Sequence, residues 1–298
     1  MTAPAPHILC IGSVLWDLIG RCDDAMQHGA DKPGRITRLP GGVAMNIAIT
    51  MVRFGFTPAL LTAIGRDAEG DELMAACAAM GMITDHVYRD HGLPTDRYMA
   101  VEGANGLIAA IADAHSLEAA GGRILAPLTD GSLGTAQAPY RGLVALDGNL
   151  TVALLEDIAA DPAFAAADLR VAPASPGKAE RLRPLLSHPG ATLYVNLEEA
   201  GLLHGTAFDT AAEAARALSD HGARRVLVTD GSRAAAKACG GQVLTAAPPP
   251  VRAARITGAG DTFMAAHISA ETAQADPQTA LDRAVQAAAA YVSGKDPT

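Results

Sequence analysis

The stretch Gly258-Ala259-Gly260-Asp261 places two glycines and a carboxylate directly before an apolar run. Glycine permits tight turns and close backbone approach to a ligand, and the apolar run predicts a packed helix. The start of a helix has free N–H groups and a partial positive charge, which bind anions. Asp261 could therefore take a proton while the neighbouring amides stabilise a developing negative charge. The alternative from this stretch alone is that Asp261 only caps the helix.

A second glycine pair, Gly41-Gly42, opens another apolar helix, with Asn46 one turn inside it. A buried amide needs hydrogen-bond partners, so Asn46 either bonds to backbone or contacts ligand hydroxyls near the glycines. Asp17 is the only charge in the apolar run that starts at residue 7 and ends at residue 19. A lone carboxylate there is costly unless it has a partner. The partner could be a ligand hydroxyl or a structural hydrogen-bond donor.

Apolar runs alternate with helical patterns along the chain, which predicts parallel strands joined by crossover helices. The ligand crevice of an open parallel sheet lies at the carboxyl ends of its strands. Several polar residues fall directly after expected strands or at expected helix starts, so they could share one crevice. These residues are Asp17, Asp147, Asn196, Thr229 and Asp261.

Residues 97–112 interrupt the alternation with two strand-like segments around Asn105-Gly106. Asn-Gly between such segments is a strong hairpin signal. Together with segment 20–40, which includes a possible strand over 35–39, this hairpin could form a small separate sheet that covers a cleft. Its exposed edge suggests a dimer, because unpaired sheet edges tend to be covered.

The composition limits the function classes. The 298 residues carry a formal charge of −9 and no block of basic residues, which disfavours nucleic acid or an anionic membrane as a partner. Four dispersed cysteines predict buried thiols rather than disulfides or a zinc site, and His267 is expected to be a packing or surface histidine. No signal peptide or membrane span is evident, so a cytoplasmic location is expected.

Four motifs together resemble those of the ribokinase-like (PfkB) carbohydrate kinases, in the same order over essentially the whole chain. They are Gly258-Ala259-Gly260-Asp261, Gly41-Gly42 with Asn46, Asn196-x-x-Glu199 and Thr229-x-Gly231. The resemblance implies an α/β fold: a three-layer α/β/α sandwich with a mostly parallel central sheet and a small β lid. It implies one kinase domain over 1–298, with the lid formed by roughly 16–40 and 95–114. The exposed edge of that lid predicts a homodimer through it.

The resemblance also implies roles in an ATP-dependent kinase that phosphorylates a hydroxymethyl group. Asp261 would be the base, and the amides of Gly258, Ala259 and Gly260 the anion hole. Small-molecule substrate contacts would come from Asp17, Gly41, Gly42, Asn46, Asp147 and Asn149. The nucleotide would lie along Asn196, Thr229 and Gly231, against the helix over 284–290, with Glu199 organising Mg²⁺ through water. We expect Asp261 to keep a low pKa at its helix start, which suffices if the proton leaves late.

The lid sequence from Tyr98 to Asp113 and the stretch Leu146-Asp147-Gly148-Asn149-Leu150 are most similar to the pseudouridine kinase branch. This similarity implies transfer to the 5′-hydroxyl of pseudouridine; another ribokinase-like sugar or nucleoside kinase is the alternative. Three positions depart from the family pattern: Leu15, Ala234 and Arg255. Arg255 stands where many members have an aspartate that helps to bind a monovalent cation, so a K⁺ requirement is doubtful.

Proteins of other classes fit less well. A ligand sensor without turnover would not need both Asp261 and the glycine loop. A dinucleotide oxidoreductase is disfavoured because no G-x-G-x-x-G follows the first strand, and a P-loop enzyme because Gly177-Lys178 lacks the earlier glycine.

Overall fold

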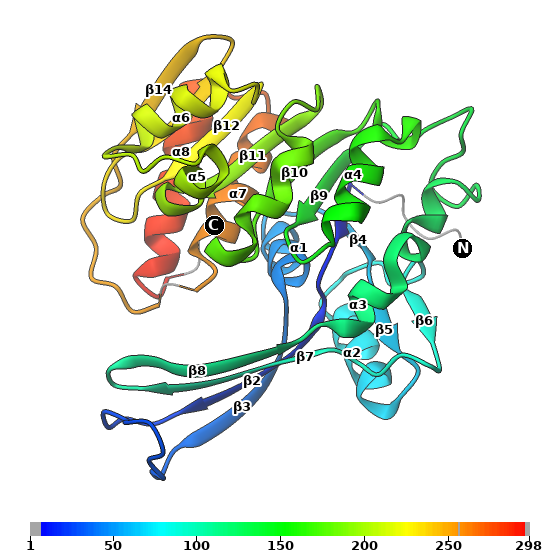
Figure 1. Ribbon diagram of the computed structural model, residues 1–298, viewed down its shortest axis with the longest axis vertical. Coiled ribbons are helices and arrows are strands. Elements are labelled where there is room, and N and C mark those ends of the chain that lie inside the picture. The colour runs from blue at the N-terminus through cyan, green and yellow to red at the C-terminus, as the bar shows by residue number, and fades with distance from the viewer. Residues whose placement is uncertain (1–6, 256, 296–298) are drawn as a thin grey trace.

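The computed structural model describes residues 7–255 and 257–295, and its centre is an eight-stranded sheet between two layers of helices (Figure 1). The strand order is β14-β13-β12-β11-β10-β9-β1-β4. In chain order the strands are β1 (Ile8–Ile11), β4 (Pro58–Leu61), β9 (Leu143–Asp147), β10 (Asp168–Ala172), β11 (Ala191–Asn196), β12 (Arg225–Thr229), β13 (Ala235–Cys239) and β14 (Gln242–Ala246). The six neighbouring strands β12, β11, β10, β9, β1 and β4 pair in parallel. Strand β13 pairs antiparallel with β12, and β14 pairs antiparallel with β13.

The strands of this sheet are apolar runs because both faces of the sheet are covered. In β1, Leu9 and Ile11 pack into one core, and Ile8 and Cys10 pack into the other. The two cores therefore use alternate residues of one strand, as the two-residue period of a strand requires.

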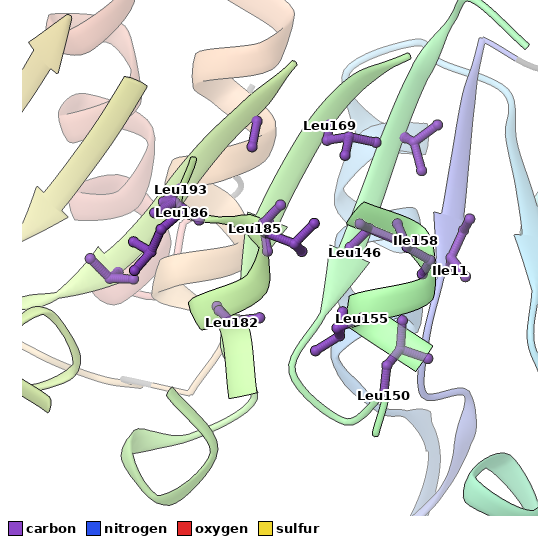
Figure 2. Packing of buried hydrophobic residues seen from close by; sticks show 14 of the residues in the cluster. Ile11, Leu146, Leu150, Leu155, Ile158, Leu169, Leu182, Leu185, Leu186 and Leu193 are labelled. Atoms are coloured by element: carbon purple, nitrogen blue, oxygen red, sulfur yellow. The ribbon is translucent and has the colours of Figure 1, made fainter. Parts of the chain in front are cut away.

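One face is covered by short helices packed on leucine-rich strands (Figure 2). In chain order they are α3 (His115–Ala120), η1 (Gly121–Leu128), α4 (Val152–Ala160), η2 (Pro162–Phe164), η3 (Pro176–Leu185), α5 (Leu197–His204) and α6 (Ala211–Asp220), where η marks a 3₁₀ helix. The sequence predicts a helix over 178–186, and the structure forms a 3₁₀ helix there, η3, over Pro176–Leu185. Pro184 lies inside it, and a proline cannot donate the backbone hydrogen bond that an α-helix needs.

The other face carries the helices that lead to the candidate site. They are α1 (Val43–Arg53), α2 (Ala68–Ala79), α7 (Ala259–Thr272) and α8 (Pro277–Val292). Helix α7 packs against both α8 and α1, and its residues from Thr262 to Ile268 are all buried. Both α1 and α7 begin near the carboxyl end of β9, because Asp147 at that strand end accepts from Ala44 N of α1 and acts on the Asp261 carboxyl of α7.

A four-stranded sheet projects from the body (Figure 1). Its order is β3-β2-β7-β8. Its strands are β2 (Leu15–Arg21), β3 (Arg35–Gly41), β7 (Arg97–Gly103) and β8 (Gly106–Asp113). The apolar run over 7–19 thus divides between two sheets: it leaves the body after β1 and enters this second sheet as β2. A short parallel pair, β5 (Ala63–Gly65) with β6 (Tyr88–Asp90), completes the strands.

The expected α/β/α sandwich with a mostly parallel sheet and a small additional β sheet is confirmed. Cys10, Cys22 and Cys77 are buried thiols, as expected, whereas Cys239 is exposed. Over residues 7–255 and 257–295, none of the helices has the length and apolarity needed to cross a membrane.

Candidate active site

Asp261 is the third residue of α7, and Gly258 occupies the N-cap position. Gly258 has a φ of 90°, a left-handed conformation that glycine adopts without strain. Because the N-cap is a glycine, Asp261 is not the capping residue, and its carboxylate is available for another role. The amides of the first turn are directed out of the helix start.

Three polar side chains influence the Asp261 carboxyl. Burial raises its pKa to about 7, and the negative charges of Asp147 and Glu199 act in the same direction. A hydrogen bond from the Asn46 side chain acts in the opposite direction. The expectation of a low pKa at a helix start is therefore wrong, because loss of hydration outweighs the helix dipole. A carboxylate with this pKa is a suitable general base near neutral pH.

Asp17 lies on β2 of the projecting four-stranded sheet, the expected lid, against Gly41 of the glycine pair. Burial raises its pKa to about 6. A Cβ atom at Gly41 would overlap the Asp17 carboxylate, so a side chain at this position would displace that carboxylate. Asp17 is paired with Tyr98 across β2 and β7, and the pKa of Tyr98 is raised by burial and by the Asp17 charge. A carboxylate and a phenol thus lie together on one lid face.

Asp147, at the end of β9, has no exposed surface. Its Oδ2 accepts hydrogen bonds from Ser13 N (2.8 Å), Ser13 Oγ (3.0 Å) and Ala44 N (3.0 Å), and its Oδ1 accepts one from Asn149 N (2.7 Å). Burial raises the pKa of Asp147, and these hydrogen bonds oppose that rise. The resemblance implies that Asp147 contacts the substrate directly, but its carboxylate is not exposed in this structure. Asp147 instead joins the β1 loop to the start of α1.

Asn149 belongs to the same network. Its Nδ2 donates to Ser13 Oγ over 2.8 Å, and its Oδ1 accepts from Lys178 Nζ over 2.6 Å. Sequence reasoning missed both Ser13 and Lys178. Ser13 follows Gly12 at the end of a strand, which is a weak signal, whereas nothing in the sequence connects Lys178 to Asn149.

The residues expected to bind the nucleotide line two neighbouring cavities. Thr229, Gly231, Ala259 and Gly260 line a cavity of about 500 Å³ with an apolar wall from α8. Asn196, Thr229 and Gly231 also line a second cavity of about 830 Å³. Both volumes are typical of small-molecule sites. The α8 residues in the wall are Val285, Ala288, Ala289 and Val292, and all four are apolar.

Asn196 and Glu199 form a capping box at the start of α5. Asn196 N donates to Glu199 Oε2 over 2.8 Å, and Glu199 N donates to Asn196 Oδ1 over 2.9 Å. Burial raises the pKa of Glu199 to about 7. Within the described part of the chain, no three His, Cys, Asp or Glu side chains are grouped to hold a metal. This donor set fits Mg²⁺ held mainly by phosphates and water, with Glu199 as a single carboxylate.

The predicted residues thus fall into groups around Asp261. Asn46, Asp147 and Glu199 influence its carboxyl directly, and Gly260 shares a cavity with Thr229 and Gly231. Asp17 and Gly41 contact each other on the lid. This arrangement can hold an alcohol on one side of Asp261 and a phosphorylated donor on the other.

The chain is similar to known kinases in sequence and in fold. The chain is 28% identical to pseudouridine kinase of Escherichia coli over 268 residues, which cover 87% of this chain and 82% of that protein. The fold is similar to that of a carbohydrate kinase from Agrobacterium tumefaciens, with 25% identity, a TM-score of 0.78, and coverage of 95% of this chain and 89% of that one. It is also similar to Arabidopsis thaliana ribokinase complexed with ribose and ATP, with 21% identity, a TM-score of 0.77, and coverage of 99% and 97%.

Residues 5–298 match the family described as pfkB family carbohydrate kinase. The match spans the motifs from which the site is built, including the glycine loop before Asp261. The chain therefore belongs to the PfkB family of carbohydrate kinases, phosphotransferases that act on an alcohol acceptor.

Proposed function

We propose that this kinase transfers the γ-phosphoryl group of ATP to the 5′-hydroxyl of pseudouridine. The observation that carries the proposal is the position of Asp261, a carboxyl with a pKa of about 7 at a glycine-opened helix start beside the nucleotide-sized cavity. The pseudouridine kinase of E. coli and the ATP complex of Arabidopsis ribokinase support the two substrates.

In the proposed reaction, the 5′-oxygen attacks the γ-phosphorus and Asp261 takes the hydroxyl proton. The bond between the γ-phosphorus and the bridging oxygen to the β-phosphorus breaks, and ADP leaves. The amides of Gly258, Ala259 and Gly260 face the charge on the transferring group. Phosphoryl transfer depends mainly on positioning and on stabilisation of negative charge, and a glycine-opened helix start supplies both.

The remaining residues have supporting roles in this proposal. Asp17, Gly41, Gly42 and Asn46 bind the nucleoside. Asp147 and Asn149 position Ser13 and the start of α1, which carries Asn46. Asn196, Thr229 and Gly231 bind the nucleotide. Glu199 contributes one carboxylate toward Mg²⁺, which supplies charge neutralisation when it is bound. A cytoplasmic location is part of this proposal, because the reaction consumes ATP.

We also propose that the protein is a homodimer formed through the lid. Ile36, Met99 and Ile111 occupy one face of the lid sheet and are 80%, 47% and 61% exposed. Asp17 and Tyr98 lie on the opposite face, because successive residues of a strand alternate. A second copy of the same apolar face would cover these side chains. Ile111→Glu should shift the sedimentation coefficient to that of a monomer; an unchanged value contradicts the dimer.

The function is tested by ADP release from ATP with a panel of pseudouridine, uridine, adenosine, ribose and fructose 6-phosphate. Turnover on pseudouridine above the others supports the proposal, whereas turnover only on the phosphosugar contradicts it. Tight nucleoside binding without any turnover indicates a sensor. Asp261→Asn should lower kcat by at least about 100-fold with little change in nucleoside binding, and a near-normal rate would remove Asp261 as the base.

A further inference from the structure

The segment before the glycine loop is bonded to the last turn of α8. Ala254 N and Arg255 N both donate to Val292 O, over 2.8 and 3.2 Å. The last carbonyls of a helix have no partner within the helix, so this segment supplies donors that the end of α8 lacks. The Gly258–Asp261 loop begins only three residues after Arg255.

The Arg255 side chain adds a positive charge at the same helix end. Its Nε donates to Tyr291 O over 2.8 Å and its Nη2 to Lys295 O over 3.1 Å. Its guanidinium carbon lies 3.8 Å from the centroid of the Tyr291 ring. A cation is favourable at the negative end of a helix dipole and over an aromatic face, so three independent contacts hold this guanidinium in place.

Tyr291 extends the connection to the glycine loop. Its hydroxyl donates to Thr257 O over 2.9 Å. A Cβ atom at Gly258 would lie 2.5 Å from the Tyr291 hydroxyl oxygen, so the loop packs directly on this ring. Tyr291 is thus in contact with Arg255 through its face and with Thr257 and Gly258 through its hydroxyl.

We propose that Arg255 is a positioning residue, a built-in cation that fixes the Gly258–Asp261 loop on the end of α8. Through Tyr291 it sets the direction of the loop amides and the place of the Asp261 carboxylate, without contacting a substrate. This inference rests on the proposed function, because it assigns Arg255 a part in phosphoryl transfer. The carbonyls of Tyr291 and Lys295 already accept hydrogen bonds from the guanidinium, and a positive charge occupies this helix end, so added K⁺ should not stimulate the enzyme.

The test compares Arg255→Ala and Arg255→Lys with Arg252→Ala, which removes an exposed arginine from the same segment. Arg255→Ala should lower kcat by about 10- to 100-fold, the usual effect of a small misplacement of reacting groups. The KM for the nucleoside should stay nearly unchanged, because Asp17 and Asn46 lie on other elements. Arg255→Lys should have a kcat between those of Arg255→Ala and the unaltered enzyme, because an ammonium group lacks the planar set of donors of a guanidinium. Arg252→Ala should behave as the unaltered enzyme.

Chemical rescue separates positioning from a general structural effect. Methylguanidinium, at millimolar concentrations well below those that denature proteins, should restore part of the kcat of Arg255→Ala and should not affect Arg252→Ala. A normal kcat in Arg255→Ala, or a loss that methylguanidinium leaves unchanged, overturns the inference.

A readout without turnover makes the test independent of the proposed substrate. Amide hydrogen exchange of the peptide over 257–263 should be faster in Arg255→Ala than in Arg252→Ala, while exchange in α1 stays the same. If the unaltered protein phosphorylates nothing in the panel, the proposed function fails, and this exchange result still decides whether Arg255 orders the loop. Equal exchange in the two variants contradicts the inference even in an active kinase.

Discussion

At the scale of single residues, the Asp261 carboxyl is governed by its neighbours. Burial and the charges of Asp147 and Glu199 raise its pKa to about 7. A general base acts in its ionised form, so kcat/KM should fall as the pH is lowered through about 7. Because three carboxyls interact, the measured midpoint belongs to the group rather than to Asp261 alone.

Glu199→Gln should move this acid limb to lower pH. The substitution removes a negative charge that raises the Asp261 pKa, so Asp261 would ionise more readily. Glutamine still fits the capping box with Asn196, so α5 should remain intact. The measurement is the pH profile of kcat/KM, with Glu156→Gln, an exposed glutamate on α4, as the control. An unchanged midpoint in Glu199→Gln would show that the two carboxyls do not interact.

At the scale of elements, Asp147 connects β9, the β1 loop and α1. Ser13 and Asp147 lie 134 residues apart in the sequence. Together they accept hydrogen bonds from the backbone N–H groups of Val43 and Ala44, at the start of α1 directly after the glycine pair. Gly42 has a φ of 94°, and a Cβ atom there would overlap the Ser13 carbonyl. The position of Asn46 therefore depends on Asp147, although the two residues belong to different elements.

Asp147→Asn should disturb this connection, because an amide NH₂ would face donors instead of accepting from them. A buried donor without an acceptor costs about 1–3 kcal/mol, so the free energy of unfolding should fall by that amount in urea titration. The KM for the nucleoside should rise, because the start of α1, which carries Asn46, loses its hydrogen bond to Asp147. Asp157→Asn, on the exposed side of α4, is the matched control. A variant with normal stability and normal KM would contradict the anchoring role.

At the scale of the whole molecule, a buried ionic cluster fixes α7 on the sheet. Glu271 accepts from Arg170 Nη1 on β10 (2.5 Å) and from Lys237 Nζ on β13 (2.7 Å). Tyr194 on β11 bonds to His267 over 2.8 Å. Burial lowers the pKa of His267 to about 3, so this ring is neutral and buried rather than a surface histidine. The helix that presents Asp261 is thereby held against three strands.

Glu271→Gln should destabilise the protein by about 3 kcal/mol, because it leaves Arg170 and Lys237 buried with too little negative charge. Urea or thermal unfolding measures this loss. The pKa of Glu271 is held at about 2, with burial outweighed by the charges around it. Its stabilisation is therefore complete above about pH 4.5, its ordinary value, and declines as the pH falls toward 2.

The control for this prediction is Glu118→Gln. Glu118 forms an exposed pair with Arg181 over 3.3 Å, and such pairs contribute at most about 1 kcal/mol. Equal effects of Glu271→Gln and Glu118→Gln would show that the cluster adds nothing beyond surface pairing.

The sequence by itself determined the features that depend on local backbone chemistry. The glycines at Gly42 and Gly258 mark helix starts because only glycine adopts their positive φ without strain. The lid hairpin follows from Asn105-Gly106, and the buried strands follow from their apolar runs. The motifs at Asp261 and Asn46 were recognisable because each is contained in a few consecutive residues.

Only the tertiary structure decided the electrostatics and the connections between distant segments. Asp261 has a raised pKa because folding buries it beside Asp147 and Glu199, and no short stretch of sequence contains that information. The hydrogen bonds from Ser13 to Asp147 and from Arg255 to Tyr291 each join residues that are far apart in the sequence. The energies of charges depend on burial and on distances across the fold, and these quantities exist only once the chain has folded.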